Sequence, residues 1–199
     1  MTYTTKRFDP AITYLVPDDG WANYEDLYGN FLLVPPDNDL AGVNEGTSDF
    51  IGVYRGVLPT QPGPSSCGDI QFPLGKQPGP TPEDLVTYYQ NQPELVLSEP
   101  NATSIGGLEG SVVDIEANPD MELTTCHDEV DGSTVEVDWV VSGIAGSDVD
   151  LGVIRDETIR LYLLQNEDLV LGIAVVDIHA ASTSLASMTD VAESLLFAP

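Results

Sequence analysis

The sequence predicts an α+β fold, in which helices pack on an antiparallel β-sheet of about six to seven strands. Three observations support this prediction. Several segments alternate apolar and polar residues with the two-residue period of a half-buried strand. Residues 169–178, LVLGIAVVDI, are apolar on both faces, as a central strand covered on two sides would be. Only residues 82–92 and 184–197 have the apolar spacing of an amphipathic helix.

The length and composition of the chain favour one domain. A chain of 199 residues with 42% hydrophobic content can bury a substantial core, but two domains would be crowded. We therefore expect a single globular domain over residues 1–199. Residues 58–80 contain six prolines with glycines between them. This composition excludes a helix or a central strand and predicts a long Pro/Gly-rich loop.

The first half of the chain is expected to contribute three strands and a helix. The strands are AITYLV, FLLV and SDFIGVYRGV, and the first of them ends at Pro17, before a turn in which Gly20 supplies unusual backbone angles. The helix at 82–92 has clear start signals, because Thr81 is a good N-cap and Pro82 suits the first helical position.

The second half of the chain supplies amphipathic strands and a final helix. SVVDIEA, which follows the turn GGLEG at 106–110, and TVEVDWVV at 134–141 both alternate apolar residues with carboxylates. Each strand should therefore have one wet face, which carries Asp114 and Glu116 in the first strand and Glu136 and Asp138 in the second. Residues 184–197 should form a helix capped by Ser182 or Thr183.

Five segments together resemble a known group of proteins. They are ITYLVPDDGWANYEDLYGNFLLVPP, GTSDFIGVYRGV, PELVLSEPNATSIGGLEGSVVDIE, TIRLYLLQN and AESLLF. These segments, which extend from about residue 10 to 197, resemble uncharacterised exported or lipoprotein domains of actinobacteria. Such domains are similar in layout to the PsbP-like α/β/α sandwich, named for an extrinsic photosystem II subunit that acts by binding. The resemblance implies a non-catalytic, extracytoplasmic binding or accessory domain of unknown ligand.

The charge of the chain restricts its partners. The 33 acidic and 6 basic residues give a formal net charge of −27, which repels phosphate backbones and anionic membranes. Nucleic acid is therefore excluded as a partner. Such acidity is common in halophile proteins and in secreted actinobacterial proteins, where a solvated acidic face keeps the protein soluble. We expect that role in preference to a site for a cationic partner. The partner would then be an unidentified protein or small ligand.

The sequence also bears on location. No stretch approaches the roughly 18 apolar residues of a membrane span, so we expect no membrane insertion by this chain. The start, MTYTTKRFDPAITY, has neither the apolar region nor the cleavage site of a signal peptide. Either the protein is cytosolic or a targeting segment lies outside this sequence. The two cysteines are far apart and lack CxxC spacing, which favours one disulfide and hence an extracytoplasmic, secreted or envelope-anchored protein.

A hydrolase is the alternative function. GTSDF at 46–50 lacks the second glycine of a nucleophile elbow. Asp177 and His179 share one face at the end of a strand, and Ser182 and Ser184 follow closely, so a Ser-His-Asp set can be drawn. A run of polar residues between a strand and a helix cap explains this Ser-His-Asp set more simply. Pairs of carboxylates, which could serve as the acid and base of a glycosidase, arise by chance among 33 acidic residues. No catalytic residue is predicted, and a hydrolase with an unrecognised site near His179 stays the alternative.

The segment TTCHDEVDGSTVEVD at 124–138 concentrates residues that can bind metals. On the EF-hand pattern, His127, Glu129, Asp131 and Asp138 occupy the first, third, fifth and twelfth ligand positions. However, the first ligand would be a histidine and the last an aspartate instead of a bidentate glutamate. An acidic turn before an amphipathic strand accounts for the same residues. We therefore predict no tight calcium site here, and no cofactor.

We predict a disulfide between Cys67 and Cys126, which lie in the polar contexts SSCGD and TTCHD. The bridge would close a loop of about 60 residues, for which the chain-entropy estimate is on the order of 4 kcal/mol. The intact mass of protein alkylated without prior reduction should show no added label. Two labelled thiols per chain, in material prepared under oxidising conditions, would contradict both the bridge and the exported location inferred from it.

Overall fold

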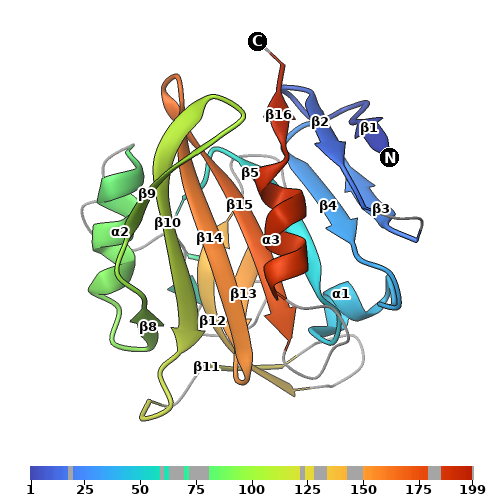
Figure 1. The fold of residues 1–199 in the computed structure, drawn as a ribbon. Helices are drawn as coiled ribbons and strands as arrows, with labels where there is room; N and C mark the ends of the chain where they lie inside the picture. The colour runs from blue at the N-terminus through green and yellow to red at the C-terminus, as the bar shows by residue number, and fades with distance from the viewer. Residues whose placement is uncertain are drawn as a thin grey trace.

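The structure, a computed structural model, confirms the α+β class and is a single domain built around an antiparallel sheet (Figure 1). It describes residues 1–17, 20–58, 61–62, 70–71, 81–121, 124–127, 134–142, 150–178 and 185–198. Within these ranges the helices are two of nine residues and one of four. None of these helices is long and apolar enough to cross a lipid bilayer.

The central sheet has eight strands, and all of its pairings are antiparallel. In order across the sheet they are β3 (Ala22–Asp26), β4 (Asn30–Val34), β5 (Phe50–Arg55), β15 (Leu169–Ile178), β14 (Glu157–Asn166), β10 (Leu108–Ala117) and β8 (Leu95–Leu97), with β9 (Asn101–Ile105) pairing with β10 beside β8.

The strand content differs from the prediction of one sheet with six to seven strands. The sequence analysis did not predict β3, β8 or β9, and the strands expected at 11–16 and 134–141 belong to smaller, separate sheets. β3 and β9 are short and polar, and β8 has only three residues. All three lie at the two ends of the central sheet, where backbone pairing with a single neighbour forms the strand without an alternating apolar pattern.

The hairpin of β14 and β15 forms the centre of the sheet. Its ten residue pairs run from Glu157 opposite Ile178 to Asn166 opposite Leu169. All residues of β15 except the first and the last two are buried, so the two-sided strand predicted at 169–178 is confirmed with the same bounds. Because successive side chains point to opposite faces, both faces of this hairpin must be covered by other elements.

Helix α2 (Pro82–Gln90) begins as the sequence predicts. Oγ1 of Thr81 accepts a hydrogen bond from the N–H of Asp84 at 3.2 Å, which is the expected N-cap. The helix is two residues shorter than the predicted 82–92. Its end is closed by Asn91, whose side-chain N–H donates to a carbonyl of the last turn at 2.6 Å.

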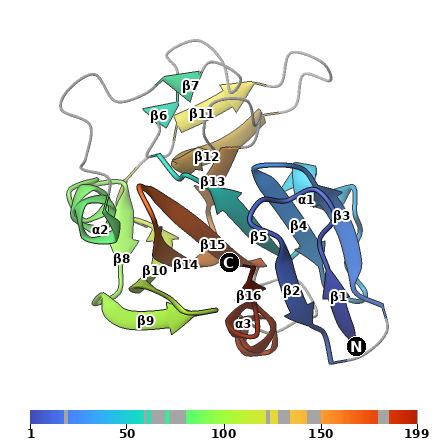
Figure 2. The ribbon, with the colours of Figure 1, turned by 90° about the horizontal axis from the view of Figure 1, so that it is seen from above.

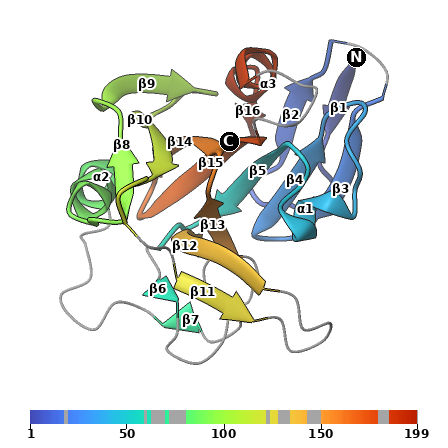
Figure 3. The same cartoon turned by 90° about the horizontal axis from the view of Figure 1, so that it is seen from below.

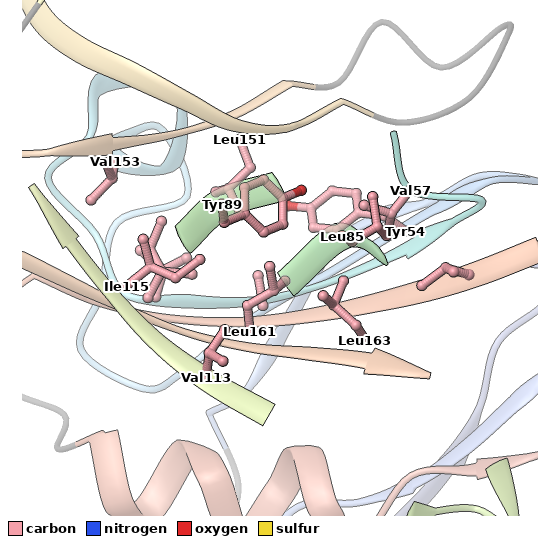
Figure 4. Packing of buried hydrophobic residues seen from close by; sticks show 14 of the residues in the cluster. Tyr54, Val57, Leu85, Tyr89, Val113, Ile115, Leu151, Val153, Leu161 and Leu163 are labelled. Atoms are coloured by element: carbon pink, nitrogen blue, oxygen red, sulfur yellow. The ribbon is translucent and has the colours of Figure 1, made fainter. Parts of the chain in front are cut away.

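The first face of the sheet is covered by α2 and by β13 (Asp150–Ile154). Leu85 and Tyr89 of α2 and Leu151 of β13 pack there with residues of the sheet, including Tyr54 (Figure 4). Leu85 is 2% exposed and Tyr89 is 1% exposed, which confirms that the apolar stripe of this helix is core packing. Burying a side chain of this size stabilises a fold by about 1.5–3 kcal/mol.

The second face is covered by a helix and by a small antiparallel sheet, namely α3 (Leu185–Glu193), β1 (Thr2–Thr4), β2 (Ile12–Leu15) and β16 (Leu196–Phe197). Met188 of α3 and Ile12 of β2 are fully buried there together with Ile173 of β15. The central sheet therefore has one nine-residue helix on each face (Figure 1).

The prediction of a C-terminal helix over 184–197 is wrong at its end, since α3 stops at Glu193. Oγ of Ser194 closes the last turn by hydrogen bonding to a carbonyl of α3 at 2.7 Å, and β16 then pairs antiparallel with β2. The strand pairing satisfies backbone groups that a further helical turn would have satisfied. The predicted cap residues, Ser182 and Thr183, lie outside the described residues.

Two further small sheets lie beyond the first face, on the side of the central sheet opposite α3 (Figures 2 and 3). One is formed by β13, β12 (Thr134–Ser142) and β11 (Thr124–His127), which confirms the strand predicted at 134–141. The other pairs β6 (Gln61–Pro62) with β7 (Ile70–Gln71). Apart from these two strands and residue 58, the predicted loop at 58–80 lies outside the described residues.

Two carboxyl groups are buried at one end of the β14–β15 hairpin. Asp49 is 0% exposed and Glu157 is 6% exposed. Oδ1 of Asp49 accepts a hydrogen bond from the N–H of Ile178 at 2.9 Å, and Oε2 of Glu157 accepts one from the N–H of Ile154 at 2.7 Å. Burial raises the pKa of Glu157 to about 7; the charge of Asp49 acts in the same direction and the N–H of Ile154 acts against it.

Replacing Glu157 by Gln should stabilise the protein relative to wild type as the pH rises. The pKa of Glu157 is about 7 in the folded protein and 4.5 as its ordinary value, so the folded state binds this proton more tightly. The stability that this proton contributes is fully present below pH 4.5 and is lost as the pH rises through about 7. The difference in unfolding free energy between Glu157→Gln and wild type should change by about 3 kcal/mol at most as the pH rises.

Urea unfolding of wild type and Glu157→Gln between pH 4.5 and pH 8 measures this difference. The exposed Glu109→Gln variant is the control, and its difference from wild type should stay nearly constant over the same range. A Glu157→Gln difference that does not change with pH would show that the carboxyl group is ionised in the folded protein throughout.

Candidate functional site

A small open pocket lies on the second face of the central sheet, between β9 and α3. Its volume is about 120 Å³. Val112 and Asp114 of β10, and Arg160 and Tyr162 of β14, form the floor. Figures 2 and 3 show β9 and α3 on the same side of these two strands, so they form opposite walls. Glu193 lines the pocket from the end of α3.

The hairpin of β9 and β10 reaches the C-terminal segment beside the pocket. Its turn consists of Gly106 and Gly107, whose φ angles are 58° and 85°, values that favour glycine. A Cβ on Gly106 would lie 2.9 Å from the carbonyl oxygen of Leu195, so the backbones approach too closely for a side chain. The sequence analysis placed the turn over 106–110, but β10 already begins at Leu108.

The central interaction of the pocket is an ion pair between Arg160 and Asp114, which are directly opposite each other on β14 and β10. Nε and Nη2 of Arg160 donate to Oδ1 and Oδ2 of Asp114 at 2.8 and 2.9 Å, and Nη1 donates to Oγ1 of Thr189 at 3.3 Å. The hydrogen bonds that Arg160 donates to Asp114 raise the pKa of Arg160, and the guanidinium stays charged.

The Arg160 guanidinium retains hydrogen-bonding capacity toward the pocket. It has five N–H donors, and three are used by Asp114 and Thr189, which leaves two. The side chain of Arg160 is 29% exposed and that of Asp114 is 33% exposed. Arg160 lines the pocket, and the two-pronged contact with Asp114 holds its guanidinium there in a nearly fixed orientation.

Tyr162 and Glu193 form a second polar contact in the pocket. The hydroxyl of Tyr162 donates to Oε1 of Glu193 at 3.0 Å. Burial and the negative charge of Glu193 raise the pKa of Tyr162, so this phenol keeps its proton at neutral pH. The contact fixes Oε1 of Glu193, while Glu193 itself is exposed at the end of α3.

The wall opposite α3 is built from Ser98 and Asn101. The N–H of Asp114 donates to Oγ of Ser98, and the N–H of Ser98 donates to the carbonyl of Asp114, both at 2.9 Å. Asn101 begins β9 and pairs with Val112 of β10, and its side-chain N–H donates to the carbonyl of Glu99 at 3.0 Å. These bonds tie the wall to the strand that carries Asp114.

Part of this site was predictable from the sequence, but its main residue was not. Asp114 and Glu116 lie on the wet face of β10, as predicted, while Val113 and Ile115 are buried on the other face. Asp114 and Glu116 do not act together as an acid–base pair, since Asp114 binds Arg160 and Glu116 accepts a hydrogen bond from Thr158 at 3.0 Å. Arg160 was missed, although it is the only basic residue of the apolar segment TIRLYLLQN.

The hydrolase alternative falls mostly outside the described residues. Of its members, Asp177 is described, whereas His179, Ser182 and Ser184 are not. Oδ2 of Asp177 accepts a hydrogen bond from the N–H of Leu185, the first residue of α3, at 3.2 Å. In the described structure this carboxylate therefore serves the helix N-terminus. The proposed serine–histidine–aspartate set stays untested.

The calcium and disulfide predictions also stay predictions. His127 lies in β11 and Asp138 in β12, but Glu129 and Asp131 are outside the described residues. Among the residues that the structure does describe, no three His, Cys, Asp or Glu side chains are grouped so that they could hold a metal ion. The backbones of Cys126 and Glu136 lie in β11 and β12, whereas Cys67 and the side chains of Cys126 and Glu136 fall outside the description.

Comparison with known proteins does not place the chain in a family. The sequence matches none of the known protein families, and no curated protein is significantly similar to it. The resemblance to exported actinobacterial domains is therefore still a prediction.

We expect Arg160 and Asp114 to be energetically coupled. In a double-mutant cycle with Arg160→Met and Asp114→Asn, the coupling energy should be about 1 kcal/mol, the upper range for half-exposed pairs, because the contact is two-pronged. Urea unfolding of the four proteins at low salt measures it. A parallel cycle of Arg160→Met with the exposed Glu109→Gln should give no coupling. Equal values in the two cycles would mean that the pair adds nothing specific.

Proposed function

We propose that the protein is a non-catalytic, extracytoplasmic binding or accessory domain whose ligand occupies the pocket between β9 and α3. One observation carries this proposal: Arg160 lines an open pocket, is held there by three hydrogen bonds, and has two N–H donors that these bonds do not use. A charged group that is oriented before the ligand arrives loses little freedom on binding, which favours recognition at such a place.

The chemistry of the pocket favours binding over catalysis. Arg160 and Tyr162 both have raised pKa values, so both keep their protons at neutral pH and act as fixed donors. Oγ of Ser98 already accepts a hydrogen bond from the backbone of Asp114, and the described residues that line the pocket include no histidine to activate it. The alternative, a hydrolase near His179, gains no support from Asp177, which binds the N-terminus of α3.

The extracytoplasmic location and the PsbP-like layout belong to the same proposal. A layered arrangement with one nine-residue helix on each face of the central sheet is compatible with an α/β/α sandwich. The predicted Cys67–Cys126 bridge supports an oxidising compartment. The location would be excluded if the purified protein from its native source had two free thiols.

A fragment screen tests the proposal. Wild-type protein labelled with ¹⁵N should show saturable amide shifts with at least one compound of a chemically mixed library, and the shifts should cluster at Asn101, Asp114 and Arg160. Arg160→Met should abolish them because it removes the fixed donors. Arg155→Met is the matched control, since Arg155 is an exposed arginine that donates to the Met121 carbonyl away from the pocket.

Two results would contradict the proposal. One is binding whose amide shifts lie away from the pocket and are unaffected by Arg160→Met. The other is turnover of an ester, peptide or glycoside substrate that is lost in His179→Ala and retained in His127→Ala, which would establish the hydrolase instead. Absence of turnover across these substrate panels is the result that we expect.

A further inference from the structure

The charges around the pocket restrict the charge of its ligand. Asp114 and Glu193 bring two carboxylates to the pocket, and the whole chain has a formal net charge of −27. An anionic ligand would be repelled on approach and would meet the Glu193 carboxylate once inside, since Asp114 is already paired with Arg160. A cationic ligand would be attracted from a distance but would lie against the Arg160 guanidinium on the floor. A neutral ligand avoids both costs.

The hydrogen-bonding groups restrict the ligand further. Arg160 offers two N–H donors, and the Asn101 amide offers a second N–H beyond the one it gives to Glu99. Oε2 of Glu193, which lines the same pocket from the α3 side, is an acceptor, because only Oε1 is engaged by Tyr162. A group that both donates and accepts matches this mixture. Adjacent hydroxyl groups do so, since each can accept from the guanidinium and donate to the carboxylate.

The size and surface of the pocket are compatible with such a group. A volume of about 120 Å³ is small beside the roughly 300–1,000 Å³ of drug-sized ligand pockets, so it suits part of one sugar ring and not an oligosaccharide. Val112 supplies apolar contact for ring C–H groups. Among the described residues that line the pocket, the aromatic one is Tyr162, which is only 1% exposed and offers no face for stacking. Affinity should therefore be low, with a Kd in the millimolar range.

We infer that the pocket between β9 and α3 binds a neutral polyhydroxylated ligand, of the class of sugar rings, through Arg160, Asn101 and Glu193. This inference rests on the proposed function, because it names the ligand class of the same pocket. The ring enters from the open side, its hydroxyl groups accept from Arg160 and Asn101, and one of them donates to Oε2 of Glu193.

Titrations followed by ¹⁵N–¹H correlation spectra test the inference with defined probes. The neutral probes are methyl α-glucoside, methyl β-galactoside and N-acetylglucosamine; inorganic phosphate and choline chloride serve as the anionic and cationic probes at the same ionic strength. At least one neutral sugar should produce saturable shifts at the amides of Asn101, Asp114 and Arg160. Phosphate and choline should leave these amides unshifted.

Two variants separate recognition from folding. Arg160→Met should weaken sugar binding at least tenfold, because it removes the charge-assisted hydrogen bonds that the guanidinium donates to the sugar. Glu193→Gln keeps an acceptor for Tyr162 but removes the charge, and should weaken binding severalfold while the fold is retained, since Glu193 is exposed. Arg155→Met and Glu109→Gln, both away from the pocket, should bind as wild type does.

The outcomes distinguish this inference from the proposed function. Shifts at the pocket with phosphate or choline, and none with the sugars, would overturn the ligand class and leave a binding pocket in place. No pocket shift with these probes or with the mixed fragment library would overturn both. Sugar binding that is unchanged in both Arg160→Met and Glu193→Gln would overturn the assigned residues and with them the inference.

Discussion

The rest of the structure depends on one constraint, which is that the β14–β15 hairpin must be covered on both faces. Its strands pair over ten residues, and most side chains on both sides are apolar and buried. Exposing either face to water would forfeit about 25 cal/mol for each Å² of apolar surface. The covering elements come from distant parts of the chain: α2 and β13 on the first face, and α3 with β1, β2 and β16 on the second.

The candidate site lies where this cover is incomplete. α3 packs mainly on β15, β5 and β2, and α2 occupies the other face of β10 and β14. The part of β10 and β14 between α3 and β9 is thus left partly open, and polar side chains occupy it, with Arg160 and Asp114 paired across the strands. Arg160 and Asp114 neutralise each other's charge on this half-covered part of the sheet. The open side of the pocket leaves room for a ligand.

Local sequence signals were enough for the elements that are strongly patterned. The N-cap at Thr81, the two-sided strand at 169–178 and the alternation around Asp114 all depend on neighbouring residues, and the structure agrees with each. The wet face of β10 was therefore predictable, but the residue that pairs with Asp114 on that face was not. Arg160 stands 46 residues away from Asp114, and only the register of β10 against β14 brings them together. Likewise, nothing local distinguishes β16 from a last helical turn.

The sequence by itself determined the α+β class, the acidic character, the start of α2 and which strand is buried on both sides, because composition, capping and periodicity are local properties. Only the tertiary structure decided that eight strands share one sheet, that α3 stops so that β16 can pair with β2, and that a pocket remains between β9 and α3. These features depend on backbone pairing and close packing between segments far apart in the chain, such as the approach of Gly106 to Leu195, which no local pattern encodes.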